Sequence, residues 1–213
     1  LQQIVYKLKK NIPVQYITGM ADFCDLKFQV DQRALIPRPE TEELVEWVIG
    51  EVNKRRLAYN TLNIVDVCTG SGCIAVSLAY HLKGSSVAAC DISADALELA
   101  SENARANGVV VDFFECNVLQ KNIPIADVDI VVCNPPYVTP AEKLQMQSNV
   151  LDYEPHVALF VPADDPLIFY RAVAGQSFRI LKPQGLLFFE INEMFPNETS
   201  KIIQTYGFEN VEI

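Results

Sequence analysis

From residue 62 onward, the sequence alternates short, almost wholly apolar segments with longer amphipathic ones. The apolar segments have the length of strands, and strands without polar alternation are buried on both faces. Such strands, separated by helices, are typical of a parallel sheet that helices cover on both sides, which predicts an α/β fold. The predicted strands are 62–68, 86–91, 111–116, 128–133 and 185–191. The predicted helices are 73–82, 94–107 after a Ser93 cap, 165–181 and 196–206, and 182–185 is the turn that ends the third of them.

The first 61 residues follow a different pattern. Residues 14–36 alternate apolar and polar side chains around Gly19 and Asp22, which predicts a β-hairpin. Prolines then fix residues 35–39 in an extended form. Between residues 40 and 56 apolar residues recur at helical spacing, with acids first and bases last, which predicts a helix.

The charge balance argues against a nucleic-acid partner. The chain has 17 basic and 27 acidic residues, a net charge of −10. Proteins that bind nucleic acids usually carry a basic stripe, and this chain has only two basic clusters, at 7–10 and 54–56. No apolar run approaches the ~20 residues of a membrane span, and the N-terminal LQQIVYKLKK has no apolar core of a signal peptide.

The cysteines indicate a reducing environment. They stand at positions 24, 68, 73, 90, 116 and 133, without a CxxC pair, and the two histidines are far apart at 81 and 156. Zinc sites need clustered ligands, so no metal site is expected. We predict reduced thiols that act as small buried apolar groups in a cytoplasmic protein, with a disulfide or metal cluster as the alternative.

In a sheet of this kind, ligands bind beyond the carboxyl ends of the strands, where the strand order reverses. Residues 68–72, Cys-Thr-Gly-Ser-Gly, follow the first predicted strand, and their two glycines allow a tight turn close to a ligand. This is neither GxGxxG nor a phosphate loop, and a plain strand-to-helix turn is the alternative. Asp91 ends the second strand, where a carboxylate can accept both ribose hydroxyls or can cap a helix. Together these features favour a nucleoside cofactor.

The third and fourth strands also end in informative residues. The third ends near Asn117 and Val118, a polar and an apolar side chain where an adenine ring could lie. The fourth ends in Asn134-Pro135-Pro136-Tyr137.

This last segment offers hydrogen-bond acceptors and few donors, because proline has no N–H. The Asn134 side-chain oxygen and the Pro135 carbonyl can accept both hydrogens of a planar NH₂ group, and Tyr137 supplies a flat face. Gripping both hydrogens turns the nitrogen lone pair toward an electrophile. The alternative is a proline-rich turn that ends a strand.

With these motifs the chain resembles the class I S-adenosylmethionine-dependent methyltransferases, in particular their amino-group branch. Two further segments are similar to the HemK/PrmC family: Ile36-Pro37-Arg38-Pro39-Glu40-Thr41-Glu42, and Tyr153-Glu154-Pro155 with Ala158-Leu159 after it. Those enzymes methylate the glutamine of the GGQ motif in class-1 peptide chain release factors. The resemblance runs from about Ile12 to the end of the chain.

The resemblance implies a Rossmann-like class I methyltransferase fold and methyl transfer from S-adenosylmethionine to a glutamine side-chain nitrogen, with S-adenosylhomocysteine as product. Residues 68–72 would wrap the methionine and ribose parts, Asp91 would hold the ribose, and Asn117 and Val118 would border the adenine. The implied cofactor-binding residues are Cys68, Thr69, Gly70, Ser71, Gly72, Asp91, Asn117, Val118 and Asn134. The implied catalytic residues, which bind the amide, are Asn134, Pro135, Pro136 and Tyr137. Arg38, Glu40 and Thr41 either shape the methionine end or cap a helix.

The chain departs from the family in several places. Asn117 stands where aspartate is usual, and residues 190–193 lack a glycine that commonly follows that strand. The final antiparallel strand pair is incomplete, although the last four residues are β-like, and the helical domain that engages the release factor is reduced to residues 1–11. We therefore expect a fragment: 1–11, a helical remnant; 12–38, a β-hairpin and linker; 39–213, the methyltransferase domain. Such a fragment is expected to bind the cofactor but to dock a release factor poorly.

Two alternatives to this function remain. One is an amino-methyltransferase that acts on adenine or guanine of DNA or RNA, and the other is a non-catalytic cofactor-binding module. The acidic balance disfavours the first, and the acceptor-rich loop disfavours the second. We expect a cytoplasmic monomer whose partner is a class-1 peptide chain release factor, with no membrane and no direct nucleic-acid binding.

Overall fold

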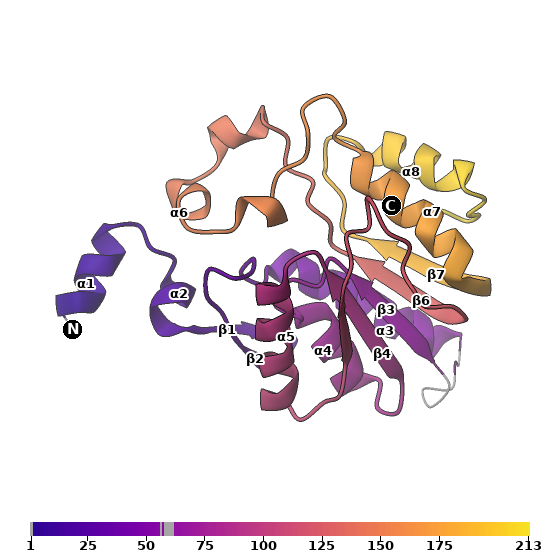
Figure 1. Cartoon of the computed structure of the whole chain (residues 1–213), viewed down its shortest axis with the longest axis horizontal. Coiled ribbons are helices and arrows are strands. Elements are labelled where there is room, and N and C mark those ends of the chain that lie inside the picture. The colour runs from indigo at the N-terminus through magenta and orange to yellow at the C-terminus, as the bar shows by residue number, and fades with distance from the viewer. Residues whose placement is uncertain (1, 56, 58–61) are drawn as a thin grey trace.

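The computed structural model describes residues 2–55, 57 and 62–213, and these form the predicted α/β architecture. Five parallel strands make one sheet in the order β5-β4-β3-β6-β7, with helices on both faces (Figure 1). The strands are β3 (Asn63–Val67), β4 (Ser86–Asp91), β5 (Asp112–Glu115), β6 (Val128–Cys133) and β7 (Leu181–Phe189). β3 and β6 are neighbours although they are far apart in the sequence, so the strand order reverses between them.

The predicted helices are also present. They are α3 (Pro39–Lys54), α4 (Cys73–His81), α5 (Ala94–Ala106), α7 (Ile168–Ile180) and α8 (Pro196–Thr205). Ser93 caps α5, since its Oγ accepts the Ala96 N–H over 3.2 Å. α7 begins three residues later than predicted because Pro166 disfavours helical backbone at the residue before it. The predicted end of α3 at Arg56 lies outside the described residues.

Two apolar clusters cover the two faces of the sheet. Consecutive strand residues point to opposite faces, so Ile64 packs with Val45 of α3 and Leu78 of α4. Val65 packs on the other side with Val173 of α7. The sheet is therefore buried between two helical layers, which explains its unbroken apolar segments.

The predicted hairpin at 14–36 is confirmed only in its central part, because residues 14–18 are helical and residues 30–36 form no strand. The segment contains α2 (Val14–Thr18), β1 (Met20–Phe23) and β2 (Leu26–Gln29). Gly19 is in the left-handed region, with φ 75°, and ends the short helix instead of lying within a strand. The hairpin turn falls at Cys24 and Asp25, whose φ values of 47° and 61° suit a tight hairpin turn.

β7 and the chain end also differ from the prediction. β7 starts directly after α7 at Leu181, and residues 182–185, predicted as a turn, bulge from the strand where its register with β6 shifts. It ends at Phe189 and not at residue 191. Residues 210–213, predicted to be β-like, form no strand, since Asn210 has a φ of 55° and interrupts the extended backbone.

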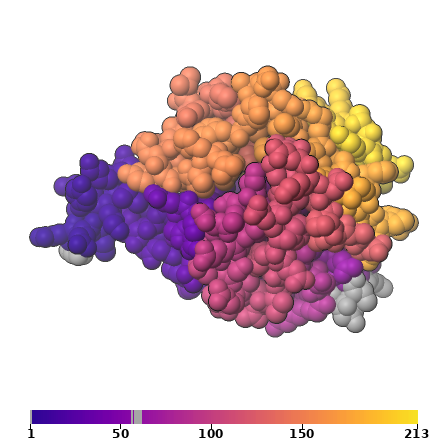
Figure 2. All heavy atoms as spheres, viewed as in Figure 1, coloured from indigo at the N-terminus to yellow at the C-terminus, as the bar shows by residue number. Residues whose placement is uncertain are grey.

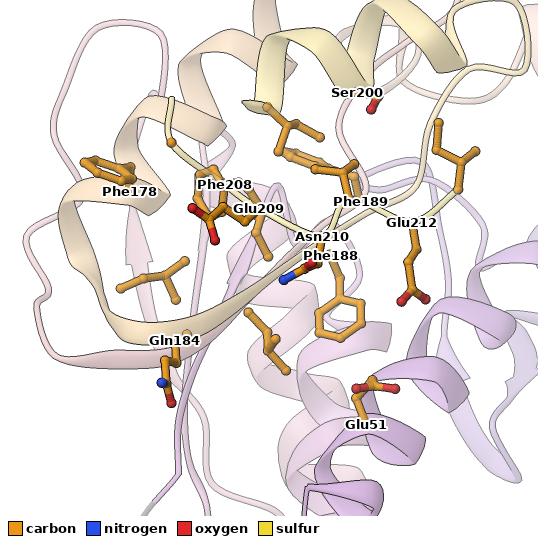
Figure 3. Close-up of a pocket in the computed structure, with 18 of the residues that line it drawn as sticks. Glu51, Phe178, Gln184, Phe188, Phe189, Ser200, Phe208, Glu209, Asn210 and Glu212 are labelled. Atoms are coloured by element: carbon orange, nitrogen blue, oxygen red, sulfur yellow. The ribbon is translucent and has the colours of Figure 1, made fainter. Parts of the chain in front are cut away.

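A cavity of about 900 Å³ lies between the chain end and β7. Figure 3 shows Phe188 and Phe189 of β7, Phe208 and Glu212 of the chain end, and Glu51 of α3 around it. Its lining shares no residue with the predicted cofactor or amide site.

Residues 139–165 form a lobe that follows β6 and contains three short helices absent from the prediction. They are η2 (Glu142–Gln145), α6 (Ser148–Leu151) and η3 (His156–Ala158). In the space-filling view this lobe lies against the indigo N-terminal end, which contains α1 (Gln2–Lys9) (Figure 2). The Tyr153 hydroxyl donates to the Lys10 carbonyl over 2.7 Å and joins the two. No helix in the described part of the chain is long and apolar enough to cross a membrane.

Candidate active site at the carboxyl edge of the sheet

The glycine-rich segment 68–72 connects β3 to α4 at the carboxyl edge of the sheet. Cys68, Gly70 and Gly72 have φ values of 62°, 54° and 81°, so the backbone turns sharply here. The Gly70 N–H donates to Asp91 Oδ2 over 2.9 Å. The structure therefore brings the predicted glycine turn and the predicted ribose carboxylate into direct contact.

The Asp91 carboxylate has the features that a ribose site requires. Each oxygen accepts one backbone N–H, Oδ2 from Gly70 and Oδ1 from Ser93, and each retains a lone pair for a hydroxyl. Burial raises the pKa of this carboxyl, and the Ser93 and Gly70 N–H groups oppose that shift. Where a Cβ on Gly70 would lie, the nearest atom is Ala34 Cβ at 4.0 Å, so the space beside the loop is open. A nucleoside cofactor fits this arrangement.

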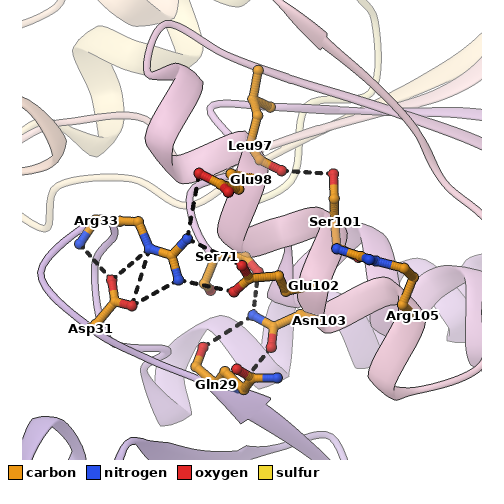
Figure 4. A network of polar contacts seen from close by, with 10 residues as sticks. All are labelled: Gln29, Asp31, Arg33, Ser71, Leu97, Glu98, Ser101, Glu102, Asn103 and Arg105. Atoms are coloured by element: carbon orange, nitrogen blue, oxygen red, sulfur yellow. Dashed lines mark hydrogen bonds and ion pairs between the residues drawn. The ribbon is translucent and has the colours of Figure 1, made fainter.

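Residues of α5 and of the hairpin support the glycine-rich segment 68–72 through hydrogen bonds (Figure 4). Asn103 on α5 is fully buried; its Nδ2 donates to the Ser71 carbonyl over 2.9 Å, and its Oδ1 accepts the Gln29 N–H over 2.7 Å. A Cβ on Gly72 would lie 2.9 Å from Ala100 Cβ, so glycine also allows α5 to pack closely. The fold therefore preorganises the loop.

Asp66, beneath the same loop, is a fully buried carboxyl group. Its Oδ2 accepts the Thr69 hydroxyl over 2.5 Å and the Ala75 N–H over 3.2 Å, while Oδ1 has no partner in the described part of the chain. Burial raises the pKa of Asp66 to about 7. The charged form is therefore costly in the folded protein.

This pKa predicts a pH-dependent stability. Between the unfolded value of 3.8 and about 7, the folded protein binds more protons at Asp66 than the unfolded one, so its stability falls as pH rises. Stability measured relative to Asp66→Asn should drop by about 4 kcal/mol from pH 4 to pH 8. Chemical denaturation of both proteins across this range measures the difference, and a difference that does not change with pH would contradict the assignment.

Asn117 and Val118 follow β5 at the same edge. The Asn117 Oδ1 accepts the Leu119 N–H over 3.0 Å, and the Val118 side chain is buried in the core. The Cys116 N–H donates to the Asp91 carbonyl over 2.8 Å and joins this segment to the end of β4. The structure places both residues near the predicted ribose site, and their contact with adenine stays a prediction.

Residues 134–137 leave β6 beside the glycine-rich segment, because Cys133 pairs with Val67 in the sheet. Both prolines are buried. The Asn134 Nδ2 donates to Glu190 Oε2 over 2.8 Å, and the Tyr137 hydroxyl donates to Glu190 Oε1 over 3.0 Å. Burial, followed by the Glu190 charge, raises the pKa of Tyr137. Glu190 is thus a site residue that the motifs did not identify.

A usable signal for Glu190 is its position as the first polar residue after the apolar segment 186–189. The predicted strand ran to residue 191 and concealed this position. Asn134 and Asp91 hold equivalent positions at the ends of their strands, and the same reasoning identifies Glu190 once β7 ends at Phe189.

Arg38, Glu40 and Thr41 take different places. Arg38 does not cap α3 with its side chain and instead forms an ion pair with the buried Glu154, Nη2 to Oε1 over 2.6 Å. The Thr41 hydroxyl donates to Glu190 Oε2 over 2.6 Å. Glu40 is exposed in the first turn of α3, where an acid suits the helix dipole. Of the three, Thr41 reaches the Asn134 side chain.

The six cysteines are free thiols, and those at 73, 90, 116 and 133 are buried. Burial raises the pKa of Cys73 to about 12, so this thiol stays protonated and unreactive. The described residues contain no group of three or more side chains suited to hold a metal ion.

Comparison with known proteins defines the class. The sequence model of a protein family, the methyltransferase small domain, matches residues 51–153 of this chain. A ribosomal protein L11 methylase from Lactobacillus delbrueckii subsp. bulgaricus has a similar fold, with a TM-score of 0.56 and 19% identity, over 84% of this chain and 74% of that one. The architecture is therefore that of a methyltransferase.

Relatives with higher identity define the family. The release factor glutamine methyltransferase of Flavobacterium psychrophilum is 46% identical over 212 residues, which is 100% of this chain and 74% of the relative. That of Bacteroides thetaiotaomicron is 42% identical over 214 residues, 100% of this chain and 75% of the relative. The chain belongs to the family of release factor glutamine methyltransferases.

Proposed function

We propose that the protein transfers a methyl group from S-adenosylmethionine to the side-chain amide nitrogen of the glutamine in the GGQ motif of class-1 peptide chain release factors. The observation that carries the proposal is the Asn134 side chain, whose Nδ2 is bonded to Glu190 Oε2 over 2.8 Å and to Thr41 Oγ1 over 3.2 Å. Its Oδ1 is then left as an acceptor at the carboxyl edge of the sheet. The neighbouring Pro135 carbonyl supplies the second acceptor that a planar NH₂ group needs.

The cofactor site is formed by three parts of this chain. Residues 68–72 would hold the methionine and ribose parts, Asp91 the ribose hydroxyls, and Asn117 and Val118 the adenine. When bound, S-adenosylmethionine supplies an electrophilic methyl group on a sulfonium. The link between Gly70 and Asp91 supports this assignment, because it places a charged acceptor directly against the glycine turn.

The residues of the chain act mainly by positioning and hydrogen bonding. An amide nitrogen is a poor nucleophile because its lone pair is delocalised into the carbonyl group. Asn134 and Pro135 would accept its two hydrogens, and Tyr137 would pack against the amide plane. No base is needed before attack, since the nitrogen would lose its proton to water after positive charge develops, so Asn134 acts as a neutral hydrogen-bond acceptor.

A protein substrate suits this chain better than a nucleic acid. The net charge of −10 disfavours binding to a polyanion. The relatives are named release factor glutamine methyltransferases, a name that indicates a protein substrate. A translation factor as substrate supports a cytoplasmic enzyme, and we propose that it acts there as a monomer.

A methyl-transfer assay tests the proposal. Purified class-1 release factor, tRNA, rRNA and DNA are each incubated with the protein and labelled S-adenosylmethionine. We expect label on the release factor and its loss when the GGQ glutamine is replaced by alanine. Label on adenine or guanine instead would support the nucleic-acid alternative, and no transfer despite cofactor binding would support a non-catalytic module.

A further inference from the structure

We propose that Glu190 is a positioning residue that sets the orientation of the Asn134 amide, so that Oδ1 and not Nδ2 faces the substrate nitrogen. The inference rests on the proposed function, because it assigns the group that aims the amide clamp. It adds the residue that directly follows β7 to an amide site that the motifs confine to the loop after β6.

The sheet register brings the two side chains together. Cys133 at the end of β6 is paired with Phe189 at the end of β7, and the Glu190 N–H donates to the Cys133 carbonyl over 3.0 Å. Asn134 and Glu190 are therefore the first residues beyond two neighbouring parallel strands. The rigid sheet, and not a flexible loop, fixes their separation.

The hydrogen bonds permit only one orientation of the amide. A carboxylate only accepts, so the Asn134 atom 2.8 Å from Glu190 Oε2 must be the nitrogen. The Thr41 hydroxyl donates its one hydrogen to Glu190 over 2.6 Å, so its oxygen accepts from Asn134 over 3.2 Å. Both amide hydrogens are thus used.

The opposite orientation is excluded by charge and by donor matching. It would set Oδ1 of Asn134 against a carboxylate oxygen of Glu190 and would turn the Asn134 NH₂ toward the substrate NH₂, donor against donor. Glu190 also accepts the Tyr137 hydroxyl over 3.0 Å. One carboxylate therefore orients both side chains assigned to the substrate amide.

Removal of the acceptor is the first test. Glu190→Leu should lower kcat for release factor methylation about 10–10²-fold, with little change in KM or in cofactor binding, because a misoriented Asn134 loses one preorganised contact. Glu190→Gln should retain more activity, since its amide oxygen can take the place of Oε2. The control is Glu193→Gln, an exposed acid in the same segment, which should behave as wild type.

A double variant separates orientation from a general structural effect. In the single variant Asn134→Asp, two carboxylates face each other. In the double variant Asn134→Asp with Glu190→Gln, the glutamine NH₂ donates to one oxygen of the aspartate. The other aspartate oxygen then faces the substrate. Glu190→Gln should therefore lower turnover in the wild-type background and raise it about tenfold in the Asn134→Asp background. A structural role would lower it in both.

Thermal unfolding gives a readout that needs no substrate. The Asn134→Asp variant should have a lower Tm at pH 7, and adding Glu190→Gln should restore most of the loss. If the Tm shows this reversal but no release factor is methylated, the proposed function fails while the Asn134–Glu190 pairing stands. If Glu190→Gln lowers turnover, or the Tm, by the same amount in both backgrounds, the inference is wrong.

Discussion

Replacement of Asn134 by alanine is expected to lower single-turnover methylation of a GGQ-containing release factor about 10²–10³-fold, the usual effect of losing one preorganised contact. Cofactor binding should stay nearly intact, because the contact is made mainly to the substrate amide. The control is Asn197→Ala, an exposed asparagine on α8, which should keep wild-type turnover. Near wild-type turnover in Asn134→Ala would mean that residues 134–137 are not the amide clamp.

Asn134→Asp is the sharper variant at this position. Aspartate still accepts a hydrogen bond from the substrate, but it cannot donate one to Glu190. The bond from Asn134 Nδ2 to Glu190 Oε2 is therefore lost, and two carboxylates meet. Their repulsion turns the side chain out of the position that aims it at the substrate amide, so the rate should fall. An aspartate variant as fast as wild type would contradict this argument.

The sheet could be predicted from the sequence because its strands are buried on both faces. Residues 86–91 and 128–133 are strands with the bounds that their apolar pattern predicted. Helix ends marked by local chemistry were also predictable, such as the Ser93 cap of α5. In these places the local sequence preference and the tertiary packing favour the same structure.

Where the local signal was ambiguous, the prediction was wrong. Residues 14–18 alternate like a strand, yet Pro13 and Gly19 bracket a single helical stretch. The hairpin turn at Cys24-Asp25 lacks the usual Asn-Gly or Asp-Gly. Short elements of this kind depend on neighbours that a sequence pattern does not reveal.

Parts of the site could be located, since strand ends of a parallel sheet share one edge. The contact between Glu190 and Asn134 could not be predicted, because it depends on the register between β6 and β7 and on the bulge in β7. The contacts of the lobe at 139–165 could not be predicted either, because the ion pair between Glu154 and Arg38 joins residues that are 116 positions apart in the sequence. The roles of the individual site residues stay predictions.

Replacement of Asp91 by alanine should weaken S-adenosylmethionine binding by about 10²–10⁴-fold. The variant loses a charged acceptor of two hydroxyl hydrogen bonds, each worth about 1.5–3 kcal/mol. It also releases the Gly70 N–H, which Asp91 Oδ2 accepts over 2.9 Å, so the glycine turn loses a support.

Calorimetry with the cofactor and its demethylated product measures the effect of Asp91→Ala directly. Asp95→Ala is the matched control, because it removes the same charge from an exposed position in the first turn of α5 and should bind as wild type. The cofactor affinity of Asp91→Asn should lie between those of wild type and Asp91→Ala, since one side-chain oxygen still accepts a hydrogen bond while the charge is gone. Nicotinamide dinucleotides should bind to none of these proteins, because residues 68–72 lack the GxGxxG spacing that cradles a pyrophosphate. Equal affinity in Asp91→Ala and wild type would remove the ribose assignment and leave Asp91 as a residue that only supports the turn.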